Sequence, residues 1–72
     1  MNFEKIVIDV LSRMGSGEGI AHSEGLLFAE VIKSIKNGVD FQNEINYAIK
    51  SLVSKGVIVH DSEKSHWIYL KK

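Results

Sequence analysis

The polar side chains with the clearest spacing lie in the segment FQNEINYAIKSLVSKG, residues 41–56. Its apolar residues recur at helical intervals and would bury one face of a helix. A solvated helix face usually carries Glu, Lys and Arg, because these residues favour both helix and solubility. The opposite face of this helix instead carries amides, hydroxyls, one lysine and one tyrosine: Asn43, Asn46, Tyr47, Lys50, Ser51 and Ser54.

These residue types can hydrogen-bond to the edges of nucleic-acid bases. Asn pairs with adenine, Lys with guanine or phosphate, and Ser with either kind of base. The aromatic ring of Tyr47 could contact a phosphate, a base or a partner protein. The simpler alternative is a solvated helix face with one semi-buried tyrosine.

Other chemistries find little support in the residue types. His22, His60 and His66 are the only soft metal ligands, and without Cys or a convergent set of carboxylates we expect no metal. The glycine-rich GSGEG, residues 15–19, follows a predicted helix and lacks the Gly-Lys-Ser/Thr of a phosphate-binding loop. No Ser-His-Asp or paired-carboxylate arrangement has an interpretable spacing. We therefore expect neither an enzyme, nor a cofactor, nor a small-molecule substrate.

Two helices are predicted before the polar segment. The first covers residues 3–14, with one apolar stripe and Asn2 as its N-cap. The glycines of residues 15–19 end it, because they favour loop conformations. The second helix covers residues 24–36, with Ser23 as its N-cap and Asn37-Gly38 as its stop.

The polar segment itself forms the third predicted helix, residues 41–55. Asp40 is the natural N-cap and Gly56 the C-terminal stop. A connection of about four residues between the second and third helices predicts a tight helix-turn-helix.

The remaining chain predicts a β-hairpin. VIVH (57–60) and HWIYL (66–70) are rich in β-branched and aromatic residues, and the polar DSEKS between them indicates a turn. Residues 20–22 could add a very short strand. If His60 pairs with His66, the hairpin has two apolar faces, of which one belongs to the core and the other is covered or used. The first face carries Ile58, Ile68 and Leu70, and the second carries Val57, Val59, Trp67 and Tyr69.

This order of elements resembles the winged helix-turn-helix superfamily. The segment INYAIKSLVSKGVIV (45–59) is similar to the recognition helix of that family followed by the Leu-x-x-x-Gly-hydrophobic start of the wing. The resemblance covers nearly the whole chain and implies a single domain, residues 1–72, that is mainly α with a β-hairpin. Three helices would carry a two- or three-stranded wing.

The resemblance also implies a function: a sequence-specific transcriptional regulator that binds double-stranded DNA. Helix 41–55 would lie in the major groove, and hairpin 57–70 would be the wing. Lys64 in the turn, with Lys71 and Lys72, would contact the DNA backbone. The alternative is that a short turn and a chain end are ordinarily rich in lysine.

A narrower similarity points to the Z-alpha branch of winged helices, which binds Z-form nucleic acid. Asn46 and Trp67 match the recognition-helix asparagine and wing tryptophan of that branch. Lys50 stands where the tyrosine belongs, and Ser65-His66 stands where prolines usually precede the tryptophan. We therefore keep Z-form binding as a minor alternative, and hairpin packing as the preferred role of Trp67.

The charge of the chain argues against strong binding to DNA. The chain has nine basic and nine acidic residues, a net charge of zero and a pI of about 6.8, and neither half is strongly basic. Phosphate binding usually appears as a basic excess. A winged helix used only for protein–protein contact is therefore the runner-up interpretation.

The size of the chain favours association. A domain of 72 residues without Cys is near the lower limit for a single apolar core. Ile8, Leu26 and Phe28 broaden the apolar surfaces of the first two helices, which predicts a homodimer. Packing of the hairpin against the first helix is the competing explanation.

The N-terminal segment bears on location. Glu4, Lys5 and Asp9 interrupt its apolar run, so we expect neither a signal peptide nor a membrane span. The chain begins with Met, and our expectation is a complete small gene product. The expected location is cytoplasmic, or nucleoid-associated if the source is bacterial or viral.

Overall fold

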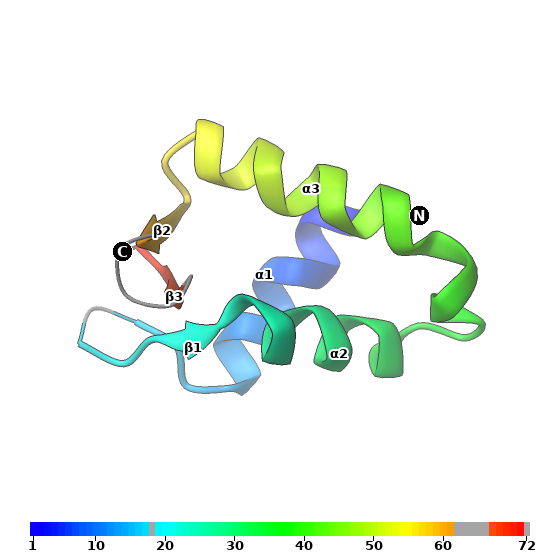
Figure 1. The fold of residues 1–72 in the computed structure, drawn as a ribbon, viewed down its shortest axis with the longest axis horizontal. Coiled ribbons are helices and arrows are strands. Elements are labelled where there is room, and N and C mark those ends of the chain that lie inside the picture. The colour runs from blue at the N-terminus through cyan, green and yellow to red at the C-terminus, as the bar shows by residue number, and fades with distance from the viewer. Residues whose placement is uncertain (18, 62–66, 72) are drawn as a thin grey trace.

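A computed structural model describes residues 1–17, 19–61 and 67–71, and shows three helices and a small sheet (Figure 1). Helices α2 and α3 lie on opposite sides of the molecule with α1 crossing between them, and the sheet lies at the end away from the α2–α3 connection. The elements in chain order are α1 (Phe3–Arg13), β1 (His22–Ser23), α2 (Glu24–Ser34), the 3-10 helix η1 (Gly38–Phe41), α3 (Gln42–Ser54), β2 (Ile58–Asp61) and β3 (Trp67–Leu70).

Side-chain caps start the first two helices where the sequence predicts them. The Lys5 amide donates to Oδ1 of Asn2 at 3.1 Å, and the Leu26 amide donates to Oγ of Ser23 at 3.1 Å. Each bond satisfies one of the amides that the first turn of a helix leaves without a partner. Both predicted N-caps are confirmed.

Helix α2 ends two residues earlier than predicted. Ile35 has extended backbone angles (φ −114°, ψ 131°), which turn its side chain into the core at 7% exposure. The Ser34 hydroxyl donates to the Val31 carbonyl at 2.8 Å and so takes up one of the carbonyls left at the helix end. The same extended residue, Ile35, therefore both ends α2 and buries its side chain in the core.

The predicted Asp40 N-cap is wrong. Asp40 lies exposed within η1, and α3 begins at Gln42 after Phe41, with no side-chain cap. The ring of Phe41 packs at 5.5 Å from that of Phe3, while Gly38 lies directly against the backbone of Ile32. These tertiary contacts fix the chain before α3, and they override the local preference of Asp for a cap.

Gly56 ends α3 as predicted. Its φ of +78° is in the left-handed region, which glycine adopts without a Cβ penalty. The Gly56 amide donates to the Val53 carbonyl at 3.1 Å, and the Val57 amide donates to the Leu52 carbonyl at 3.0 Å. This is a Schellman motif, and it redirects the chain from α3 into β2.

The sheet has three antiparallel strands in the order β1-β3-β2. The predicted pairing of His60 with His66 is wrong, because His60 lies opposite Ile68. This register differs from the expected one by two residues, so Ile58, Ile68 and Leu70 still share one face. Ile58, Ile68 and Leu70 are buried together, whereas Val59 and Tyr69 on the other face are half-buried.

One apolar core joins all three helices to the sheet. Its edge at β3 also holds a buried polar side chain, Ser16, whose Oγ accepts a hydrogen bond from the Leu70 amide at 3.1 Å. Ile8 and Phe28 pack against this core, whereas Leu26 is 47% exposed. The buried apolar residues are Val7, Val10, Leu11, Leu27, Val31, Ile35, Ile45, Ala48, Ile49, Leu52, Ile58, Ile68 and Leu70.

Candidate nucleic-acid interface

The structure places the six predicted residues of the third helix on the outer side of α3. Five of them are exposed and Ser51 is half-buried, while the opposite side of the helix lies in the core. Residues four apart are neighbours on a helix surface, so the polar side chains form two rows. The first row, facing α1, is Asn43, Tyr47, Ser51 and Lys55; the second row is Asn46, Lys50 and Ser54.

The first row borders an open hollow between the starts of α1 and α3. Met1 and Tyr47 are both 75% exposed beside it, and Phe3 and Ala48 contribute apolar lining. Glu44 adds a carboxylate to the same hollow. This part of the face therefore combines an exposed aromatic ring, apolar surface and negative charge.

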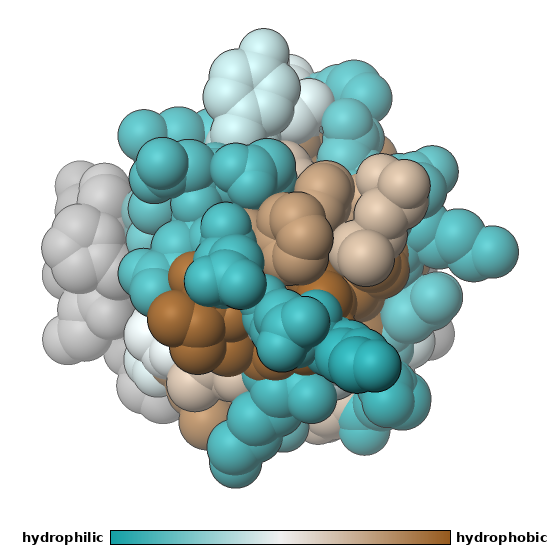
Figure 2. All heavy atoms as spheres, turned by 90° about the vertical axis from the view of Figure 1, so that its right-hand side faces the viewer, coloured by the Kyte–Doolittle hydropathy of each residue, from teal (hydrophilic) through white to brown (hydrophobic). Residues whose placement is uncertain are grey.

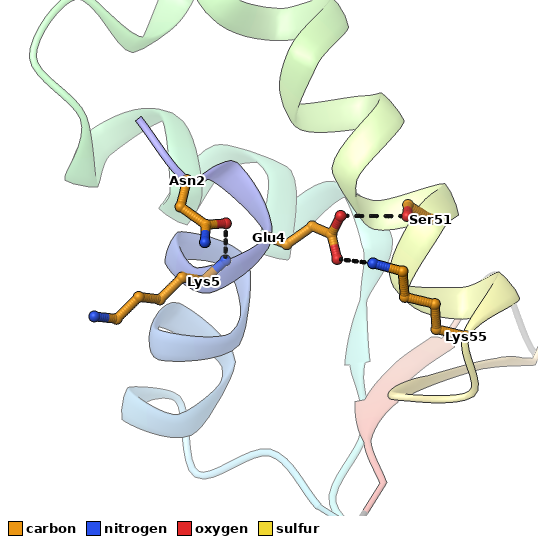
Figure 3. A network of polar contacts seen from close by, with 5 residues as sticks. All are labelled: Asn2, Glu4, Lys5, Ser51 and Lys55. Carbon is orange, nitrogen blue, oxygen red and sulfur yellow. Dashed lines mark hydrogen bonds and ion pairs between the residues drawn. The ribbon is translucent and has the colours of Figure 1, made fainter.

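The far end of the first row is tied to α1 by Glu4 (Figure 3). The Lys55 Nζ lies 2.8 Å from Oε1 of Glu4, and the Ser51 hydroxyl donates to Oε2 at 3.4 Å. The hydrogen bond from Lys55 lowers the pKa of Glu4 below its ordinary value. Partial desolvation of the carboxylate raises the pKa, whereas the charge of Lys55 and the hydrogen bond from Ser51 lower it further. Ser51 and Lys55 are thus engaged within the chain.

The second row borders another hollow, between α3, the start of α2 and β2. Asn46 and Lys50 line it with Glu24 and His60. The Nε2 of His60 lies 3.1 Å from Oε2 of Glu24, which joins β2 to the start of α2. Lys50 therefore lies on a surface that also carries a carboxylate.

The lysines do not converge beside α3. Lys33 lies 3.6 Å from Glu30 on α2, in a hollow that it shares with Arg13 of α1. Lys50 is the basic residue of α3, and Lys55, the C-cap residue that follows the helix, is paired with Glu4. Lys64, the predicted wing contact, lies outside the described residues. Within the described chain, the positive charge is spread over several faces.

The histidines of the sheet occupy its two outer strands. His22 and His60 both lie opposite Ile68, so they share the face of the sheet that meets the core. Over residues 1–17, 19–61 and 67–71, no three His, Cys, Asp or Glu side chains are grouped so that they could hold a metal ion. His66 lies outside these ranges.

Apolar surface also gathers at the end of the molecule where α2 connects to α3 (Figure 2). Polar side chains surround it, and Val39 of η1 is 64% exposed. Ile8 and Phe28, which the sequence offers as dimer contacts, are partly buried and pack against the core. A homodimer stays a prediction, with Leu26 and Val39 as its exposed apolar residues.

Sequence reasoning missed Glu4 and Lys55 as parts of the outer face. They are 51 residues apart, and no local pattern connects them. The lysine was recognisable as the next i,i+4 neighbour of Ser51, but its partner depends on how α1 crosses α3.

The fold and this face together define a winged helix-like domain in which α3 has one exposed, polar face. Comparison of the chain with protein-family models, with curated proteins and with solved structures found no match. In the described part of the chain, no helix has the length and apolar character needed to cross a membrane.

Proposed function

We propose that this chain belongs to the winged helix-turn-helix superfamily and binds double-stranded DNA as a sequence-specific transcriptional regulator. Helix α3 would lie in the major groove, and the β2–β3 hairpin, with Lys64 between its strands, would be the wing. The observation that carries the proposal is the outer face of α3, where Asn43, Asn46 and Lys50 are exposed while the opposite face is buried.

The residue types of this face have distinct roles in the proposal. Asn43 and Asn46 have the side chains that read adenine, and Lys50 can contact guanine or a phosphate. Tyr47, which is 75% exposed, adds a ring and a hydroxyl one turn after Asn43. The face therefore offers base recognition with little net charge.

That balance predicts modest affinity for one copy. Phosphate contacts provide most of the non-specific affinity, and they need free cationic side chains. Two copies on a two-fold-related site would double the contacts, which is how helix-turn-helix dimers bind palindromic half-sites. Sedimentation at micromolar concentration should accordingly show a dimer, and a monomer under these conditions would contradict this part of the proposal.

The test is fluorescence anisotropy with a labelled random-sequence duplex over a salt series. Lys50→Ala should weaken binding and reduce the slope of log affinity against log salt by about 1, because one phosphate contact is lost. Tyr47→Ala should weaken binding with little change in slope, because the phenol is neutral. Lys33→Ala is the matched control, since Lys33 lies with Glu30 away from α3.

The absence of binding at low salt would refute the DNA proposal. If the duplex is bound, direct base reading is tested by selecting preferred sequences from a random pool. Asn46→Ala should relax the preference at one position of the selected site, at a cost of about 1–3 kcal/mol in discrimination.

A second candidate function is recognition of a partner protein by the same face. The hollow beside Tyr47 favours it, because apolar lining from Phe3 and Ala48 lies next to Glu44. Aromatic residues are enriched at the centres of protein interfaces. Binding to such a partner would be nearly insensitive to salt, whereas DNA binding would fall steeply as salt rises.

A further inference from the structure

The contact between α1 and the end of α3 has the form of an occupied anion site. Lys55 and Ser51 converge from one helix on the two different oxygens of the Glu4 carboxylate, at 2.8 and 3.4 Å (Figure 3). An ammonium and a hydroxyl are also donors that proteins direct at the oxygens of DNA phosphates. The carboxylate therefore occupies a place where a phosphate would find the same two partners.

We propose that Lys55 and Ser51 form a phosphate-binding pair for the DNA backbone, and that Glu4 occupies this pair in the free protein as an internal competitor. This inference rests on the proposed function. It makes Glu4 a residue that lowers the affinity of the protein for DNA. While Glu4 is charged it would keep Lys55 from the DNA backbone, and loss of that charge would let a phosphate take its place.

Position supports this role. Ser51 and Lys55 continue the row that begins with Asn43 and Tyr47, at successive i,i+4 steps. At 1.5 Å per residue, the row from Asn43 to Lys55 is about 18 Å long. A duplex contacted along this row would therefore bring its backbone to the end where Lys55 lies.

Accessibility supports it as well. The side chains of Lys55 and Glu4 are 58% and 35% exposed, so water and solution ions reach the pair. Exposed ion pairs contribute little to folding stability, because water and salt screen them, so the loss of this pair would cost the fold little. The lowered pKa of Glu4 shows that the carboxylate is stabilised in its charged form by the group it would have to release.

The competing explanation is that Glu4 only fastens α1 to α3. Under that explanation, removal of its charge would change stability but leave DNA affinity as it was. Under the proposal, removal of the charge frees Lys55, so one more phosphate contact forms and more counterions are released. The two explanations differ in the salt dependence of binding.

The test compares the wild type with Glu4→Gln, which keeps the shape of the side chain and removes its charge. Anisotropy with a random-sequence duplex should show about threefold to tenfold tighter binding at low salt and a slope steeper by about 1. Glu30→Gln is the matched control, because it removes one negative charge from an exposed pair on α2. It should change affinity by less than about twofold and leave the slope unchanged.

A second pair of variants assigns the effect to Lys55. Lys55→Ala alone should have little effect on affinity, because Glu4 already occupies the lysine. In the Glu4→Gln background, Lys55→Ala should abolish the added slope. A Glu4→Gln protein that binds like the wild type, or one whose gain survives the loss of Lys55, would overturn the inference while leaving the proposed function intact. If none of the proteins binds DNA at low salt, both proposals fail.

Discussion

Replacement of Gly38 by alanine provides a direct test of how α3 is positioned. A Cβ at Gly38 would overlap the carbonyl oxygen of Ile32 and lie 2.9 Å from its Cα. These are backbone atoms of α2, so no side-chain rotation can relieve the overlap. Either η1 or the end of α2 must move, and both lead into α3.

The size of the effect follows from this geometry. Overpacking that forces backbone shifts costs about 1–3 kcal/mol, and the rigid neighbours place Gly38→Ala near the upper end, at about 3 kcal/mol. A chain of 72 residues has a total stability of only about 4–11 kcal/mol. The expected shift in melting temperature is therefore a fall of about 12–24 °C.

Gly25→Ala is the matched control for this substitution. Gly25 lies in the first turn of α2, and a Cβ there would meet nothing within 4 Å. Alanine restricts the unfolded chain and favours helix, so this variant should gain up to about 1 kcal/mol.

Guanidinium unfolding, followed by circular dichroism, measures both free energies of unfolding. The reasoning would be refuted if Gly38→Ala retained wild-type stability, because the close approach to Ile32 would then not exist. It would also be refuted if both glycine variants lost stability equally, because the cause would then be the backbone preference of alanine rather than the contact.

Two further predictions concern the buried serine and the ion pair. Ser16→Ala should lower the free energy of unfolding in urea by about 1–3 kcal/mol, because the Leu70 amide loses its partner inside the protein. The control Ser12→Ala, at an exposed position of α1, should be nearly neutral. Equal losses in both variants would contradict this role for Ser16. The pKa of Glu4 is lower in the folded chain than its ordinary value of 4.5, so its contribution to stability is complete above that pH and disappears as the pH falls through the lowered value. The difference in unfolding midpoint between the wild type and Glu4→Gln should therefore shrink below about pH 4.5, and a difference that is constant down to pH 3 would show that the Lys55 contact does not hold the carboxylate charged.

The helices were predictable because local signals agree there. Asn2 and Ser23 precede apolar residues at helical spacing, and both caps form as expected. Asp40 carries the same kind of signal, yet η1 forms in its place because Phe41 packs on Phe3, 38 positions earlier in the chain. No local pattern contains that contact.

The hairpin shows another limit of prediction from sequence. Alternation assigns Ile58 and Ile68 to one face correctly, but it is unchanged by a slide of two residues. Alternation alone therefore does not choose between His66 and Ile68 as the partner of His60, and the structure pairs His60 with Ile68.

For the candidate interface, the sequence predicts which side of α3 is exposed. It does not predict which polar groups are already engaged. Ser51 and Lys55 appear equivalent to Ser54 and Lys50 in the sequence, and only the crossing of α1 over α3 separates them.

The strand order β1-β3-β2 has a consequence for the way the domain forms. The central strand, β3, is the last of the three in the chain, so neither β1 nor β2 has a strand partner until residues 67–70 are present. His22 must find Ile68 across a long stretch of chain, which makes this pairing a slow, non-local step. All three helices precede β3 in the chain, so they can form and pack before the sheet, which closes only when β3 joins β1 and β2.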